Sequence, residues 1–232
     1  MNIFQRIALL EKDIAQAERD RKLEGTWKRE LKEAVEQAKH VQHFRPVPRD
    51  GVDYAYGHAN PAALARAHAT FAVRYINSGS GKDLTRMEAE DLSHGGIDLA
   101  VVMETTAGFM NNSKGGSTSR QALAVAHEVG MPKGRPVYFA HDEEGNIAPA
   151  VRFLRAAIDA NGVGQIGAYG GIDFIEAAHH AGVRYLWQTL AWSRGRWSPH
   201  AQLRQIINGR KVAGIDVDID RAVAADFGQW RT

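Results

Sequence analysis

The stretch FAVRYINSGSGKDLTRMEAEDLSHGGIDLAVVM, residues 71–103, contains the pattern that decides the fold. Its apolar run at 71–76 predicts a β-strand, and a second apolar run at 97–103 predicts another. Between them Thr85 is a typical N-cap residue, and Glu88 three positions later completes a capping-box pattern for a helix. A strand, a helix and a second strand in this order predict a parallel βαβ unit with a right-handed crossover.

The same alternation continues on both sides of this unit. Eight strand candidates in about 180 residues predict an α/β fold, a compact (β/α)8 barrel of the TIM type with some helices shortened or lost. An open doubly wound sheet is the main alternative, but it usually has a glycine-rich turn after its first strand, and DYAYGH at 53–58 does not fit. The other strands are expected at 51–55, 136–140, 165–169, 184–188, 203–207 and 212–217, and the other helices at 61–69, 119–129, 147–160 and 173–181.

The first 45 residues have a different pattern. Apolar residues recur there at three-to-four spacing, which is typical of an amphipathic helix, and Gly25 interrupts the pattern. We therefore expect a helical hairpin extension at 1–45, a linker at 46–50 and the barrel domain at 51–232. The apolar stripe is expected to pack on the main domain or on a second copy of the chain. Targeting, or homo-oligomer formation through 1–45, is the functional alternative.

The composition limits the classes of function. Of 232 residues, 44% are hydrophobic and 24% charged, which is typical of a globular protein. A net charge of +2 does not indicate a nucleic-acid binder, although it is compatible with an anionic polymer. The absence of cysteine excludes disulfides, thiolate nucleophiles and cysteine-ligated zinc, and the ten histidines form no His-Glu-x-x-His motif. We expect no metal and no other cofactor.

Carboxylates follow several of the predicted strands, where the active site of a barrel lies. Asp142 and Glu144 are two residues apart, so on extended backbone they face the same side. One could be a general acid with a raised pKa while the other stays ionised, which is the arrangement that glycosidic cleavage uses. A structural network of ion pairs would look similar in the sequence. The other carboxylates at strand ends are Asp53, Glu104, Asp216 and Asp218.

Polar and aromatic residues accompany these carboxylates. Arg74 is expected to pair with the buried Asp53 and, with Gln188, to orient substrate groups. A long polar loop at 105–120 is expected to form a wall of the site. The aromatic residues expected to stack on substrate are Tyr169, Trp187 and Trp192.

Two familiar motifs do not fit. SGSGKD at 78–83 resembles part of a phosphate-binding loop, but the full pattern needs glycine at position 76, which is Ile76, and serine or threonine at position 83, which is Asp83. The segment therefore predicts an ordinary βα loop. No Gly-x-Ser-x-Gly motif is present, so a serine esterase is not expected.

Seven motifs together resemble one family, the glycoside-hydrolase-like domain family of actinobacterial and actinophage proteins. That family is related to the family 25 glycoside hydrolases, which are lysozyme-type muramidases on a (β/α) barrel. The resemblance runs in order from about Gly51 to Trp230 and implies the same fold. The motifs are FAVRYI (71–76), KDLTRME (82–88), VME (102–104), GRPVYFA (134–140) with Asp142, GAYGG (167–171), YLWQTLAWS (185–193) and GIDVDID (214–220).

The resemblance also implies roles for individual residues. The muramidase Asp-x-Glu motif matches Asp142 and Glu144, which implies that Glu144 is the general acid/base. Asp142 would then stabilise the cationic transition state or position the acetamido group of the substrate. The first-strand and last-strand aspartates of the family match Asp53 and Asp216.

The expected function is therefore that of a peptidoglycan glycoside hydrolase, such as a phage endolysin or a virion-associated lysin. A non-catalytic glycan-binding or virion structural barrel is the first alternative. A metal-dependent phosphoesterase that uses Asp53, Glu104, Asp142 and Asp216 as oxygen ligands is the second.

The start of the chain bears on localisation. MNIFQRIALLEK, residues 1–12, lacks the basic region and the cleavage site of a signal peptide, and no apolar run approaches the roughly 18 residues of a membrane span. We therefore expect cytoplasmic synthesis without a signal peptide, followed by action on the cell wall after release or as part of a virion.

Overall fold

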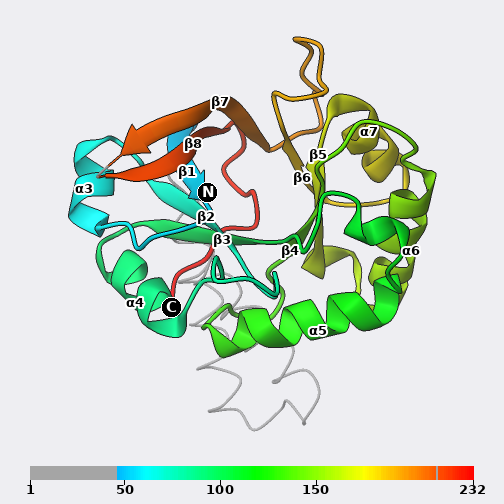
Figure 1. Ribbon diagram of the computed structural model, residues 1–232, viewed down its shortest axis with the longest axis horizontal. Helices are drawn as coiled ribbons and strands as arrows, with labels where there is room; N and C mark the ends of the chain where they lie inside the picture. The colour runs from blue at the N-terminus through cyan, green and yellow to red at the C-terminus, as the bar shows by residue number, and fades with distance from the viewer. Residues whose placement is uncertain (1–45, 213) are drawn as a thin grey trace, which may run out of the picture. The chain divides into compact units, whose positions relative to one another are not determined.

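A computed structural model describes residues 46–212 and 214–232; the predicted hairpin extension at 1–45 lies outside them. Eight strands close a barrel in the order β1 to β8, and the helices lie around its outside (Figure 1). The predicted (β/α)8-type barrel is confirmed. The strands are β1 (Arg49–Tyr54), β2 (Phe71–Tyr75), β3 (Asp98–Met103), β4 (Val137–His141), β5 (Ile166–Gly170), β6 (Tyr185–Gln188), β7 (Leu203–Val212) and β8 (Ile215–Ala222).

The helices follow the first five strands. Asn60 and Thr85 cap two of them, as the sequence predicts, by accepting hydrogen bonds from Ala63 N and Glu88 N. Within the described residues, no helix has both the length and the apolar character that a membrane span needs. The helices are α3 (Pro61–Arg66), α4 (Arg86–His94), α5 (Gly115–Glu128), α6 (Ala148–Asn161) and α7 (Ile172–His180), with 3₁₀ turns at Phe109–Asn111 and Val163–Gln165.

The last two strands differ from the prediction. Strands at 203–207 and 212–217 were expected, whereas β7 and β8 are longer and form an antiparallel hairpin, seen as the two orange-red arrows in Figure 1. Only residues 213 and 214 join them, and a parallel crossover needs about a dozen residues or more. β8 is therefore antiparallel to β1 as well, whereas the pairs from β1–β2 to β6–β7 are parallel.

The strands divide the core into two layers because successive side chains point to opposite faces. In β2, Phe71 and Val73 point into the barrel, where they pack with Tyr138, Trp187 and Phe227. Their neighbour Ala72 belongs to the outer layer, between the strands and the helices. This alternation decides which residue at each strand end reaches the mouth of the barrel.

The barrel begins two residues earlier than predicted. β1 starts at Arg49, so the last two residues of the predicted linker at 46–50 are strand. Arg49 Nη1 lies 2.7 Å from an oxygen of the fully buried Asp98, whose other oxygen accepts from Arg231 Nε at 2.6 Å. These ion pairs tie the first strand and the end of the chain to β3.

Candidate functional site

Polar side chains gather inside the barrel at the carboxyl ends of its parallel strands. Asp53 is the inward residue near the end of β1, and its register partner on the antiparallel β8 is Asp218. Burial and four surrounding carboxylates raise the pKa of Tyr75, the last residue of β2. The four carboxylates belong to Asp53, Glu104, Asp142 and Asp218. The barrel mouth is therefore acidic, as the strand-end carboxylates predict.

Gln205 of β7 connects this cluster. Its Nε2 donates to Asp53 Oδ2 at 2.9 Å and to Asp218 Oδ2 at 3.0 Å. Its Oε1 accepts from the hydroxyls of Tyr169 and Thr189, at 3.0 and 2.7 Å. Both ends of the amide are thus occupied, which fixes its orientation and holds the two aspartates in place.

Asp53 and Asp220 form a buried acid pair beneath the mouth. Burial, the first cause, and the charge of Asp218 raise the pKa of Asp53 to about 7. Burial and the charge of Asp53 raise the pKa of Asp220 further above its ordinary range. Trp187 Nε1 donates to one Asp220 oxygen at 2.8 Å. Both carboxyls therefore hold a proton to a higher pH than an exposed aspartate does.

Asp142 is one of the partly exposed carboxyls of the group. It follows β4, and its backbone N donates to Ala107 O at 3.3 Å. Burial raises the pKa of Asp142 to about 6, with further increases from the charges of Glu104 and Asp218, whereas Lys82 lowers it. A carboxylic acid with this pKa and access to solvent can donate a proton near neutral pH.

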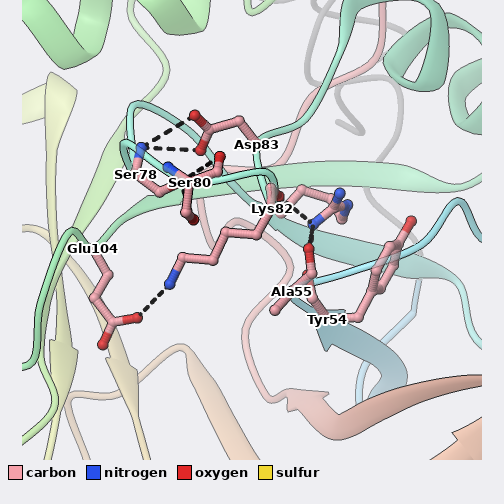
Figure 2. A network of polar contacts seen from close by, with 8 residues as sticks. Tyr54, Ala55, Ser78, Ser80, Lys82, Asp83 and Glu104 are labelled. Carbon is pink, nitrogen blue, oxygen red and sulfur yellow. Dashed lines mark hydrogen bonds and ion pairs between the residues drawn. The ribbon is translucent and has the colours of Figure 1, made fainter.

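Lys82 is the cation of the mouth. Its Nζ lies 2.9 Å from Glu104 Oε2 and 3.9 Å from the centre of the Tyr75 ring. Figure 2 shows the lysine extended toward Glu104 from the loop after β2. Asp83 closes that loop by accepting from Ser78 N at 2.9 Å, so the predicted βα loop is confirmed. Sequence reasoning missed Lys82, although a lysine after a barrel strand is a usable signal.

Arg74 does not serve the predicted role. It points outward between Val73 and Tyr75, and its guanidinium binds Glu88 Oε1 at 2.8 Å rather than Asp53. It also donates to the backbone oxygens of Tyr54 and Lys82, at 2.6 and 3.2 Å. Alternation along β2 decides this, because only one of the neighbours 74 and 75 can face the interior.

Gln188 and Trp187 are not substrate contacts either. Gln188 is fully buried and outward, where its amide donates to Ser193 Oγ and Arg196 O and accepts from Ser198 N. It therefore holds the loop after β6. Trp187 is only 2% exposed and donates to Asp220, so no substrate ring can stack on it. Tyr169 reaches the mouth with its hydroxyl but is 9% exposed.

Glu144 and Asp216 lie away from the cluster. β4 ends at His141, so the extended backbone that would keep Glu144 on the side of Asp142 does not continue. The Glu144 side chain is 65% exposed and lies 3.3 Å from Arg194 Nη2. Asp216, 80% exposed, pairs with Lys211 near the tip of the hairpin, because β8 continues past it. Asp218 and Asp220 take the expected place of Asp216.

Of the two remaining predicted residues, Glu104 lies at the mouth and Trp192 does not. Glu104 pairs with Lys82 there, and Trp192 lines a separate cavity with Glu144 outside the barrel. Within residues 46–212 and 214–232, no three His, Asp or Glu side chains are arranged to hold a metal ion. The metal-dependent phosphoesterase stays an untested alternative.

The acid pair predicts a pH-dependent stability. The pKa of Asp53 is raised from 3.8 to about 7, so the folded chain keeps a proton that the unfolded chain releases. This contribution is complete below about pH 4 and is lost as the pH rises through about 7. We therefore compare the melting temperatures of Asp53→Asn and the unsubstituted protein. The difference, variant minus unsubstituted protein, should rise between about pH 5 and pH 8. Parallel melting curves across that range would contradict a raised pKa.

Comparisons with known proteins identify the family of this chain. A family model described as "Rv2525c-like, glycoside hydrolase-like domain" matches residues 62–224. A relative from Mycobacterium tuberculosis named "Putative peptidoglycan hydrolase Rv2525c" is 28% identical over 198 residues, 77% of this chain and 82% of the relative. The family resemblance expected from the sequence is confirmed.

Solved structures share the barrel. The crystal structure of the Tat-secreted M. tuberculosis protein Rv2525c with L-tartrate has a TM-score of 0.73 and 27% identity, covering 79% of this chain and 100% of that one. The catalytic domain of endolysin ply40 from Listeria monocytogenes bacteriophage P40 has a TM-score of 0.53 and 15% identity, covering 79% and 96%. That second likeness concerns the fold alone.

The first of these structures corrects the expected localisation. Rv2525c is described as Tat-secreted, and it matches over its whole chain. This contradicts the expectation of a protein made without a signal peptide and freed by other means.

Proposed function

Because the chain belongs to the Rv2525c-like glycoside hydrolase-like domain family, we propose that it hydrolyses a glycosidic bond in bacterial cell-wall glycan. The name of the M. tuberculosis relative, "Putative peptidoglycan hydrolase Rv2525c", supports this substrate class. The observation that carries the proposal is the half-exposed Asp142, whose pKa is raised to about 6 beside Glu104 and Asp218.

In the proposed mechanism Asp142 is the proton donor. As the bond between the anomeric carbon and the leaving oxygen breaks, the Asp142 proton moves to that oxygen. A positive charge develops on the sugar ring in the transition state. The carboxylates of the mouth, Asp218 first among them, stabilise that charge. Water then supplies a hydroxyl to the anomeric carbon, and its remaining proton restores Asp142.

Two other groups support this chemistry. Lys82 and Glu104 form an ion pair beside Asp142, and their opposite charges act on its pKa in opposite directions. Gln205 fixes the separation of Asp53 and Asp218. We assign these residues to positioning and electrostatics, and proton donation to Asp142, whose pKa is raised to about 6.

This assignment moves the general acid away from Glu144. We expect Glu144→Gln to release reducing ends from peptidoglycan at a rate within about tenfold of that of the unsubstituted protein. The reason is that Glu144 faces Arg194 outside the barrel. The measurement compares initial rates at equal protein concentration, with and without a chelator. A loss of about a hundredfold or more would restore the role that the family motif implies for Glu144.

One observation favours a second candidate function. The glutamate of the Asp-x-Glu motif is turned out of the mouth, which is compatible with a barrel that binds wall glycan without cleaving it. Co-sedimentation with peptidoglycan that survives Asp142→Asn, without release of reducing ends by the unsubstituted protein, would identify this function. A role as a phage endolysin or virion-associated lysin is a narrower form of the first proposal.

A further inference from the structure

A cavity lies at the carboxyl end of β4, among the residues that follow β4, β5 and β6. Its volume is about 220 Å³, room for about seven water molecules at about 30 Å³ each. His141 lines it, and Asp142 follows directly in the sequence. Successive residues at a strand end point to opposite sides, so the proposed proton donor and this cavity flank the same backbone.

His141 gives the cavity a buried ring nitrogen without a hydrogen-bond partner among the described residues. The side chain is only 1% exposed and stacks on Phe174 with ring centres 4.8 Å apart. Burial lowers the pKa of His141, so the ring is neutral near pH 7. The ring nitrogen Nε2 has no hydrogen-bond partner among the described residues.

Glu143 places a second acceptor opposite this nitrogen. Its Oε1 lies 3.7 Å from His141 Nε2, and Asn111 Nδ2 holds the same oxygen at 2.7 Å. A neutral imidazole carries its proton on one nitrogen only, and with that proton on Nδ1 both Nε2 and the carboxylate offer lone pairs with no proton between them. The pair therefore needs a donor from outside the chain, and a positively charged donor most of all.

The other charges of the cavity already have partners. Arg194 lies 3.3 Å from Glu144 and 3.9 Å from Asp173, and Arg196 also lies 3.4 Å from Asp173. Asp173 also lies in the first turn of α7, where it offsets the positive end of the helix. Among the residues that the structure describes, Glu143 is thus the lining carboxylate that pairs with no arginine or lysine and faces only the buried His141.

We propose that His141 and Glu143 bind the protonated primary amine of a cell-wall component. The ammonium group would donate to His141 Nε2 and Glu143 Oε1, and Trp192 and Phe174 would flank its carbon chain. The amine belongs either to an unacetylated amino sugar or to a diamino acid of a wall peptide. Naming the wall as the source rests on the proposed function, whereas amine binding itself does not.

Calorimetric titration of the full chain separates the two sources. The probes are a glucosamine tetramer, the fully N-acetylated tetramer and the peptide Ala-Lys-Ala. We expect one of the two amines to bind, and that binding to weaken by about tenfold or more in Glu143→Gln and in His141→Phe. The phenylalanine keeps the ring on Phe174. Glu90→Gln, at an exposed carboxylate paired with Arg86, is the matched control and should bind like the unsubstituted protein.

Three results would overturn the proposal: binding of neither amine, equal binding of the N-acetylated tetramer, or unchanged binding in both cavity variants. The Asp142→Asn variant separates this failure from that of the proposed function. If Asp142→Asn still binds the amine, and the unsubstituted protein releases no reducing ends from peptidoglycan, the proposed hydrolase is rejected. The proposed amine site then still stands.

Discussion

Asp142→Asn is expected to release reducing ends from peptidoglycan about 10²- to 10⁴-fold more slowly than the unsubstituted protein, the usual contribution of a general acid. The amide keeps the size of the side chain but cannot donate a proton to the leaving oxygen. Because Asp142 is half-exposed and follows the strand, its replacement should leave the barrel folded. A melting curve close to that of the unsubstituted protein would show this.

A control variant and a pH profile accompany the Asp142→Asn experiment. Asp216→Asn is the matched control, since Asp216 is an exposed aspartate paired with Lys211 and should keep full activity. The rate of the unsubstituted protein should fall as the pH rises above about 6, where Asp142 loses its proton. Equal rates for Asp142→Asn and the unsubstituted protein would assign proton donation to another group.

Arg74→Met is expected to lower the free energy of unfolding by about 3–5 kcal/mol, the usual cost of removing one partner of a buried ion pair. Glu88, which is 2% exposed, would keep its charge without the guanidinium that it faces at 2.8 Å. Tyr54 O and Lys82 O would lose the same donor. Chemical denaturation at one pH measures the change.

A second substitution tests the cause. Arg74→Met combined with Glu88→Leu should recover most of the loss, because an apolar pair leaves no buried charge. Arg86→Met removes an exposed ion pair to Glu90 and should change stability by about 0.5 kcal/mol or less. If the double variant were as unstable as the single one, lost packing rather than the unpaired carboxylate would explain the effect.

Part of the site was predictable from local patterns. Asp53 and Asp142 follow or end apolar strands, and both lie in the mouth as expected. The sequence also offers two other candidates for the place predicted for Asp216. Asp216, Asp218 and Asp220 are spaced two residues apart, so on a strand all three lie on the same face. Choosing among them required the position at which β8 crosses the mouth, which its pairing with β1 decides.

The sequence by itself determined the barrel and the acidic character of its mouth, because both follow from short-range periodicity. Only the tertiary structure decided which neighbours face that mouth. Glu144 turns away because β4 ends at His141, and Arg74 turns away because Tyr75 takes the inward position. Such outcomes, and the raised pKa of Asp142, depend on strand ends and on charges brought together from distant parts of the chain.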